Sequence, residues 1–299
     1  MEISQLEYFV ILARIRHFTR AARSMSITQS ALSHSMRKLE KELGVALFER
    51  TEQGVTLTAA GQDFLSHAER SLNELKKGKN ELEEMKNPGR GLIRLSFIHS
   101  LGTGLIPFLL AGYEKHCARF VLSQNDSASL TRNLLEGKND LCLCPPMMSM
   151  ENIIWVYLFS EKLYAALPRS HRLAQRKSLA VKDLEKEPFI FLKRSYNLRV
   201  LSEEFLAGAG VNPLVMYEGD DVNTLAGLIS AGLGVSILPE TEGTDRSDIV
   251  FIPFSDRPLT REIGLAWNGS VPLTAAADAF RQYVLSCFPH QEAGLSDKV

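Results

Sequence analysis

The sequence predicts an α/β protein with a small, mostly α-helical front part, a long connecting helix and a larger back part. Near the N-terminus, apolar residues recur every three or four positions in three short segments. A longer periodic segment runs from about Thr58 to Lys86 and stops at N-P-G-R-G, Asn87 to Gly91. Beyond it, short apolar runs alternate with helical patterns, which is typical of a parallel sheet covered by helices.

The bulk properties indicate several domains and, at most, a local nucleic-acid surface. A length of 299 residues exceeds that of most single domains, and 45% hydrophobic residues are ample for buried cores. Through Arg90 there are 14 basic against 12 acidic residues, net +2, and the remainder holds 20 against 23, net −3. The sign of this weak asymmetry suits a DNA-binding front end.

We expect a cytoplasmic protein without a membrane segment. The N-terminal sequence M-E-I-S-Q-L-E-Y-F-V has neither a basic leader nor a long apolar run. The four cysteines, Cys117, Cys142, Cys144 and Cys287, are too few and too scattered for a disulfide scaffold, which points to a reducing compartment.

The front part predicts a helix-turn-helix. Helices are expected from Gln5 to Ala13, from about Thr19, and from Thr28 to Glu42, where Thr28 is a plausible N-cap. The third helix has an apolar face of leucine and methionine, and a polar face rich in Gln, Ser, His and Arg. Such side chains reach base edges and phosphates, although a simply solvated helix face is the alternative.

Two elements follow Gly44, which is expected to end the third helix. The run V-A-L-F-E-R-T-E-Q-G-V-T-L-T predicts a two-stranded hairpin, the wing of a winged helix-turn-helix. The helix from Thr58 carries interlocking heptads that predict pairing of two chains, with packing on its own domain as the alternative. The heptad positions are Leu65, Ala68, Leu72, Leu75 and Leu82.

The back part predicts two α/β halves with a cleft between them. Trp267 is expected in a strand that crosses back to the first half, where it packs in the core. Strands are expected at 92–98, 120–124, 140–144, 189–192, 213–217 and 235–239, and helices at 104–116, 127–136, 203–209 and 222–231.

Specific segments in this order resemble the LysR-type transcriptional regulators over essentially the whole chain. They are L-E-Y-F, F-T-R-A-A-R-S-M-S-I-T-Q-S-A-L-S-H-S-M-R-K-L-E-K-E-L-G-V-A-L-F-E-R, L-T-A-A-G, L-L-E-G-K-N-D-L and A-G-L-G-V-S-I-L-P. The resemblance implies a regulator whose promoter binding a small-molecule effector modulates. Its partners would be promoter DNA, the effector, RNA polymerase and further copies of the chain, as a homodimer or homotetramer through the linker helix and regulatory domains.

The resemblance also implies the domain organisation. Residues 1–58 would form the winged helix-turn-helix, 59–87 the linker and dimerisation helix, and 88–91 a hinge. Residues 92–299 would form an effector domain resembling the periplasmic-binding-protein type 2 fold. Its subdomain 1 would span about 92–162 and 267–290, and its subdomain 2 about 163–266.

Family DNA contacts carry over onto the third helix and the wing. Two departures are notable: His34 stands where Arg is common, and Glu52 and Gln53 occupy a wing tip that often holds a basic residue. Glu52 would repel phosphate, so specificity should depend more on the third helix. The implied DNA-binding residues are Thr28, Gln29, Ser30, Ser33, His34, Arg37 and Arg50.

A carboxylate-bearing effector is expected in the back part. Helices begin where strands end at Ser100 to Gly104, Asp126 to Ser129 and Ser195 to Asn197, and helix N-termini favour anions. Arg194 and Tyr196 would close over the ligand. The alternative is that the serines only cap helices. The expected effector-binding residues are Ser100, Leu101, Ser127, Arg194, Ser195 and Asn197.

The main rival classes find little support. We see no phosphate loop, no G-x-S-x-G and no metal-binding histidine pair, so we expect no enzyme, no cofactor and no metal. Cys142 and Cys144 share one face of a strand without further ligands and are expected to be buried structural thiols. A cytoplasmic ligand-binding module without specific DNA recognition is the alternative that remains.

Overall fold

The computed structural model describes residues 1–51, 54–86, 91–113, 118–147, 152–240 and 248–289. Two units separate by their internal contacts. The first unit comprises residues 1–86 together with 136–138, and the second comprises 87–135 and 139–299. The hinge predicted at 88–91 falls mostly on residues 87–90, which lie outside the described residues.

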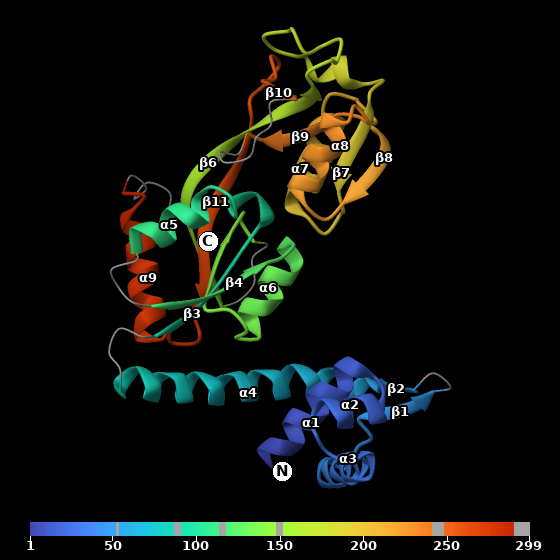
Figure 1. Ribbon diagram of the computed structural model, residues 1–299, viewed down its shortest axis with the longest axis vertical. Coiled ribbons are helices and arrows are strands. Elements are labelled where there is room, and N and C mark those ends of the chain that lie inside the picture. The colour runs from blue at the N-terminus through green and yellow to red at the C-terminus, as the bar shows by residue number, and fades with distance from the viewer. Residues whose placement is uncertain (52–53, 87–90, 114–117, 148–151, 241–247, 290–299) are drawn as a thin grey trace, which may run out of the picture. The chain divides into compact units, whose positions relative to one another are not determined.

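The first unit contains the predicted winged helix-turn-helix (Figure 1). Leu32 and Leu39 of the third helix are fully buried in the same core as Phe9, whose ring centre lies 5.3 Å from those of Phe48 and Phe64. Its elements are α1 (Ile3–Ile15), α2 (Phe18–Ser24), α3 (Gln29–Leu43), β1 (Phe48–Thr51), β2 (Gly54–Leu57) and α4 (Ala59–Lys86).

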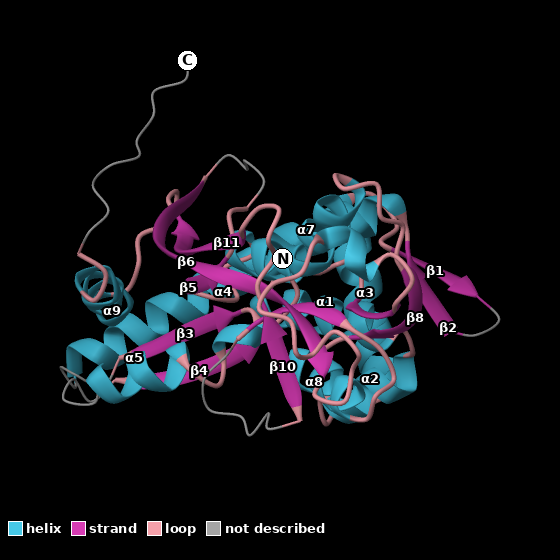
Figure 2. Cartoon of the chain, turned by 90° about the horizontal axis from the view of Figure 1, so that it is seen from above, coloured by secondary structure: helices cyan, strands magenta, loops and turns pink. Residues whose placement is uncertain are grey.

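The wing is an antiparallel hairpin of β1 and β2, visible as two short magenta arrows in Figure 2. It docks on the end of α1, because the Val55 N–H donates to the Arg16 carbonyl at 3.1 Å. Gly54 has φ +140°, and a Cβ there would lie 2.5 Å from the Arg16 oxygen. Glycine is therefore needed at this close approach of two backbones.

Helix α4 divides its apolar residues between two environments. Ala68 is buried in the core of the first unit, and Leu65 and Leu72 are half-buried against the same core. Leu75 and Leu82 are 52% and 62% exposed. The first half of α4 therefore packs on its own domain, which was the alternative to pairing, and pairing of two chains along the heptad positions stays a prediction.

The second unit alternates strands and helices as predicted, up to β5. Its elements are β3 (Leu92–Phe97), η1 (His99–Leu101), α5 (Leu105–Tyr113), β4 (Arg119–Gln124), α6 (Ser127–Leu135), β5 (Leu141–Cys144), β6 (Ile153–Pro168), η3 (Val181–Leu184), β7 (Pro188–Leu192), α7 (Asn197–Ala207), β8 (Leu214–Gly219), α8 (Val222–Ser230), β9 (Ser236–Pro239), β10 (Ile249–Ile252), β11 (Leu259–Asn268) and α9 (Ala275–Ser286).

The main sheet is mixed rather than purely parallel. Its strand order is β10-β6-β11-β5-β3-β4, with β9 also paired to β6. Strand β3 is parallel to β4 and β5, whereas β11 runs antiparallel to both β5 and β6. The long strand β6 and helix α9 were not foreseen from the sequence, whereas α7 begins at Asn197, within the range Ser195 to Asn197 where a helix was expected to start.

Two hydrophobic cores share the second unit. One core includes Leu158 of β6 and Ile263 of β11, and the other includes Leu163 of β6 and Leu259 of β11. The same two paired strands therefore serve both cores, and the change from one core to the other occurs between these positions. Trp267 packs in the first of these cores, as predicted, with the Arg281 guanidinium 4.8 Å from its ring centre.

Candidate nucleic-acid interface and effector site

Helix α3 presents a polar face while its apolar face is held in the core. The Thr28 hydroxyl accepts a hydrogen bond from the Ala31 N–H at 3.2 Å, which confirms the predicted N-cap. Gly44 ends the helix with φ +72°, in the left-handed region that glycine favours. Because Leu32, Met36 and Leu39 are buried on the opposite side, the orientation of the polar face is fixed.

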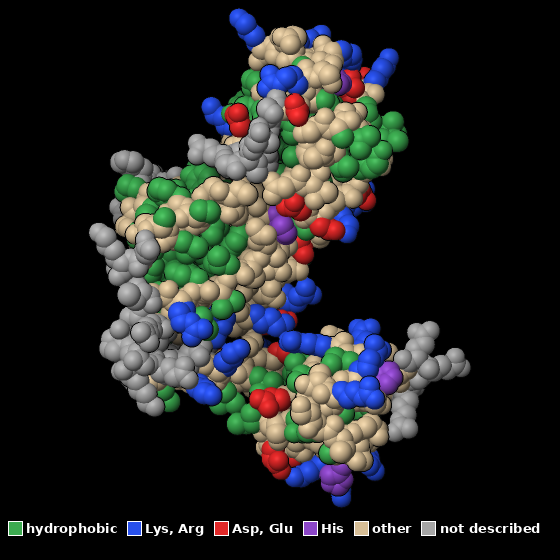
Figure 3. All heavy atoms as spheres, viewed as in Figure 1, with side chains coloured by type: hydrophobic (Ala, Val, Ile, Leu, Met, Phe, Trp, Pro, Cys, Tyr) green, Lys and Arg blue, Asp and Glu red, His purple; other side chains and the backbone are tan. Residues whose placement is uncertain are grey.

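Most of the predicted DNA-binding side chains are exposed on this helix. Gln29, Ser30, His34 and Arg37 are exposed, and Ser33 is half-buried. Arg37 Nε donates to the carbonyl of its own helix at Ser33, 3.3 Å away, so its guanidinium lies along the helix. The polar face is thus a row of donors and acceptors that no other described element covers. The first unit carries Lys and Arg side chains on the side that Figure 3 shows.

For the wing, the structure describes the backbone of β1 and β2 but not the side chain of Arg50. Arg50 pairs with Val55 in the hairpin register, but its side chain lies outside the described part of the chain. The same holds for Glu52 and Gln53, so the prediction of a phosphate-repelling wing tip stays a prediction.

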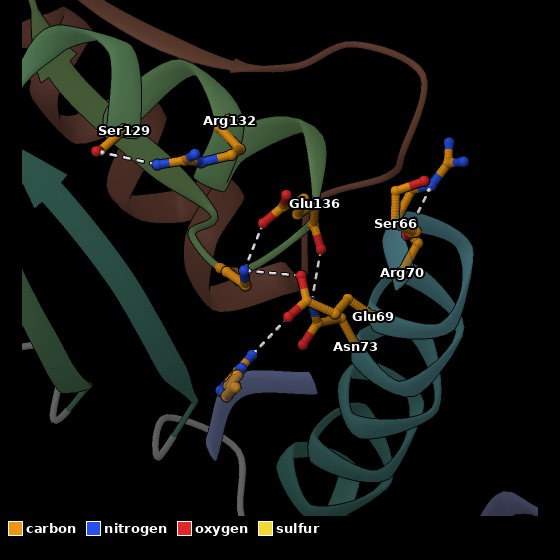
Figure 4. Close-up of polar contacts among 9 residues, drawn as sticks. Ser66, Glu69, Arg70, Asn73, Ser129, Arg132 and Glu136 are labelled. Carbon is orange, nitrogen blue, oxygen red and sulfur yellow. Dashed lines mark hydrogen bonds and ion pairs between the residues drawn. The ribbon is translucent and has the colours of Figure 1, made fainter. Parts of the chain in front are cut away.

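A buried carboxylate, Glu69 of α4, lies in the first unit (Figure 4). It accepts hydrogen bonds from Arg14 Nη2 at 2.7 Å and from Lys138 Nζ at 2.9 Å, and nearby the Asn73 amide donates to the Glu136 carbonyl at 2.6 Å. Burial alone would raise the pKa of Glu69, but the hydrogen bonds and charges of Arg14 and Lys138 outweigh it and lower the pKa.

Ser100 and Leu101 lie in the η1 turn that follows β3 in the second unit. Both residues are buried. The Ser100 hydroxyl accepts a hydrogen bond from Arg261 Nη2 at 2.8 Å and does not cap η1, whose N-cap is Ile98. The helix-capping alternative is therefore wrong for Ser100.

Ser127 and Asn197 are brought together. The Asn197 N–H, at the start of α7, donates to the Ser127 hydroxyl at 3.3 Å. Ser127 therefore caps α7, whereas its own helix is capped by Asp126, which accepts from the N–H groups of Ala128 and Ser129 at 3.1 Å each. The anion position expected at the start of α6 is thus filled by a carboxylate of the chain itself.

The remaining predicted residues of the α7 loop lie apart from this contact. Ser195 is exposed, and the Arg194 guanidinium is 3.9 Å from Glu203, with its side chain 80% exposed. Arg194 lines a surface hollow with Arg199, Val215, Met216 and Glu218. The structure does not join Arg194 with Ser100.

Three further residues at this place were missed by sequence reasoning, and the first of them is His99. The rings of His99 and Tyr196 lie 5.7 Å apart, edge to face, and His99 Nδ1 is buried without a partner among the described residues. Burial raises the pKa of Tyr196, and the charges of Asp220, Asp126 and Asp221 raise it further. The other two are Arg261 and Glu161, which form a buried ion pair.

A signal for Arg261 was present in the sequence. In L-T-R-E-I, buried and exposed residues alternate, and Arg261 occupies an inward position between Leu259 and Ile263. A charged residue at an inward position of an alternating strand requires a buried partner. Its partner Glu161 is 100 residues earlier, which no local pattern reveals.

Cys142 and Cys144 are buried in strand β5, as expected. A hydrogen bond from Cys142 and burial raise the pKa of the Cys144 thiol well above its ordinary value. Because the thiolate is the reactive form of a cysteine, this shift disfavours reaction at Cys144. No group of three or more metal-binding side chains occurs in the described part of the chain.

The winged helix-turn-helix and the two-core α/β unit together define a class of DNA-binding proteins with a separate ligand-binding domain. The family profile described as "Bacterial regulatory helix-turn-helix protein, lysR family" matches residues 3–62, and the profile described as "LysR substrate binding domain" matches residues 86–288. The chain belongs to the LysR family of transcriptional regulators.

Curated relatives extend over nearly the whole chain. The regulator YybE of Bacillus subtilis, itself uncharacterized, is 41% identical over 96% of this chain and 99% of its own length. The dual regulator GltC of the same organism is 32% identical over 98% of this chain and 99% of its own length.

Solved structures share the fold. Full-length CbnR, crystallised with its target DNA, matches with a TM-score of 0.75 at 23% identity over 96% of this chain and 99% of that one. The effector-binding domain of QuiR with shikimate matches with a TM-score of 0.64 at 23% identity, over 67% of this chain and 98% of that one. Among the described helices none combines the length and apolarity needed to cross a membrane.

Proposed function

We propose that this chain is a cytoplasmic promoter-binding regulator, without catalytic activity, that reads DNA with α3 and the wing. A small carboxylate-bearing effector bound in the second unit alters the binding of the chain to DNA and its interaction with RNA polymerase. The DNA contacts would be made by Thr28, Gln29, Ser30, Ser33, His34, Arg37 and Arg50.

The observation that carries the DNA-reading proposal is the polar face of α3. Its exposed Gln29 and Arg37 are the side-chain types that form two hydrogen bonds to adenine and guanine, respectively, in the major groove. Because Leu32 and Leu39 are buried in the core, α3 is held against rotation about its own axis. The position of the corresponding helix in a winged helix-turn-helix fold, and the DNA-bound state of CbnR, support the same role.

The second half of α4 supports pairing of chains. Leu75 and Leu82 are exposed at heptad spacing. A second helix that packs on them would bury their apolar surface, which favours pairing. Two strand edges of the second unit carry further exposed apolar residues: β4 has Val121 and Leu122, and β8 has Leu214 and Met216. A homodimer or homotetramer through the linker helix and regulatory domains uses these surfaces.

We place the effector site where the two cores of the second unit share β6 and β11. Ser100, Ser127 and Asn197 contribute polar groups there, and Leu101 contributes an apolar wall. We divide the effector domain at this place, between Leu158 and Leu163 and between Leu259 and Ile263. The shikimate held by the QuiR domain supports a small-molecule ligand in a domain of this fold.

In vitro selection from a random duplex library tests the DNA-reading proposal without knowledge of the target genes. We expect the full chain to enrich a motif of two half-sites, and methylation of guanine N7 in the major groove of each half-site to interfere with binding. A library that shows no enriched motif after repeated rounds would favour the ligand-binding module without DNA recognition.

A further inference from the structure

A buried ion pair lies where the second unit passes from one core to the other. Arg261 of β11 and Glu161 of β6 are direct partners in the antiparallel register. Both lie between the last residue of one core and the first of the other on their strands. The Arg261 side chain is 5% exposed and that of Glu161 is 14% exposed.

The hydrogen bonds of Arg261 use only one side of its guanidinium. Nε donates to Glu161 Oε1 at 2.7 Å, and Nη2 donates both to the same oxygen and to the Ser100 hydroxyl. Within the described residues Nη1 donates to no protein group, and it is not among the buried unpartnered atoms. Nη1 is therefore open, next to a hydroxyl that also belongs to the site.

The unused groups on Arg261 and Ser100 are donors. Since the Ser100 oxygen accepts from Arg261, the hydroxyl proton of Ser100 is left to donate elsewhere. A guanidinium carries five N–H groups and no acceptor, and the two N–H groups on Nη1 remain to donate to a ligand. The ligand group that fits these donors is an acceptor with negative charge.

Stability alone does not account for this ion pair. Two charges taken out of water lose hydration that their attraction offsets only in part, so an apolar pair of similar size is often as stable or more stable. Here Arg261 reaches from a crossover strand to a turn that carries predicted effector contacts, at Ser100. At that position the guanidinium has some N–H groups bonded to Glu161 and Ser100 and others without a partner among the described residues, and this arrangement suits recognition of a ligand.

We propose that Arg261 binds the carboxylate of the effector through the Nη1 side of its guanidinium together with the Ser100 hydroxyl. Glu161 holds the guanidinium in this orientation and neutralises it while the site is empty. The inference deepens the proposed effector site, on which it rests, and assigns the anion to Arg261 rather than to the exposed Arg194.

The test compares folded full-length variants against a panel of small carboxylates and the neutral amide of each. The double variant E161Q/R261Q removes both charges and keeps hydrogen-bonding side chains of similar shape, so no buried charge is left alone. The variant R194Q is the matched control, because it removes one exposed guanidinium at a position that the sequence predicted as an effector contact. Thermal shift identifies a binding carboxylate, and calorimetric titration measures its affinity.

We expect a carboxylate to bind the parent chain and R194Q equally, its amide to bind at least tenfold more weakly, and E161Q/R261Q to lose at least tenfold in affinity. Ser100→Ala, which leaves the ion pair in place, should lose about fivefold, as for one hydrogen bond. Circular dichroism shows whether the double variant folds. If it does not, the affinity of Ser100→Ala tests the assignment instead.

Equal carboxylate affinity in the parent chain and folded E161Q/R261Q would overturn the assignment of Arg261. So would undiminished affinity in Ser100→Ala, or a panel in which only amides and amines stabilise the parent chain. In these cases the DNA selection still stands as a separate test: an enriched motif would keep the proposed regulator and remove only this anion site.

Discussion

Truncation of the two exposed leucines of α4 should weaken association between chains. The double variant Leu75→Ala/Leu82→Ala removes the apolar surface that the first unit leaves uncovered. Full burial of a leucine contributes about 1.5 to 3 kcal/mol. Scaled by exposed fractions of 52% and 62%, with two copies of each side chain in a symmetric pair, the contact amounts to about 3 to 7 kcal/mol.

At about 1.4 kcal/mol per tenfold change, even the low end of this range corresponds to a loss of about 100-fold in the association constant. Alanine keeps the helix propensity of α4, so the helix itself should persist. Sedimentation equilibrium of the full chain over a wide concentration range measures the effect. The control Lys76→Ala/Lys79→Ala alters exposed polar positions of the same segment and should leave association unchanged.

The reasoning fails if the leucine variant associates within threefold of the parent chain. That result would mean that other surfaces, such as the edges of β4 and β8, hold the chains together without α4.

Three further predictions concern the first unit. Gln29→Ala should cost about 1 to 3 kcal/mol at the selected site and relax base preference at one position, whereas equal binding in a salt-matched titration would contradict the contact. Leu32→Ala should destabilise the first unit by about 2 to 5 kcal/mol, because Leu32 is fully buried; an unchanged denaturant midpoint would show that the core does not depend on it. Glu69→Gln should destabilise the first unit by about 1 to 3 kcal/mol at neutral pH. Because the pKa of folded Glu69 is lowered, its contribution is present above the pKa of the unfolded chain and is lost as the pH falls through the folded pKa, so parent and variant should converge in acid; a constant difference down to acid pH would refute this role.

Local patterns predicted the first unit almost completely. Thr28, Gly44 and the buried spacing of Leu32 and Leu39 are signals within one helix, and a helix whose neighbours are close in sequence can be read locally. The extent of α4 was also predicted correctly, since Thr58 directly precedes its first residue and Lys86 is its last. What local spacing could not tell was that Ala68 and its neighbours pack on α1 and the wing core, because a heptad pattern does not identify its partner.

For the second unit, most helices and strands were predicted, but the pairing of its strands was not. The runs that became β3, β4 and β5 were clear, but the antiparallel position of β11 depends on a pairing with β6 that spans about 100 residues. The same distance separates Arg261 from Glu161, which is why the ion pair was missed. The serines at 100 and 127 were found by position, yet their hydrogen bonds to Arg261 and Asn197 are tertiary contacts that no helix-capping rule predicts.

The most direct test of the central claim, that α3 reads DNA sequence, is the ratio of affinities of the full chain for its selected duplex and for a scrambled duplex of equal length and composition. We predict a ratio of about 1,000 or more near physiological salt. Affinity for both duplexes should fall steeply with salt, since phosphate contacts contribute to each. A ratio near one, with the same salt dependence for both duplexes, would show that the chain binds the DNA backbone only and would contradict the role of Gln29 and Arg37.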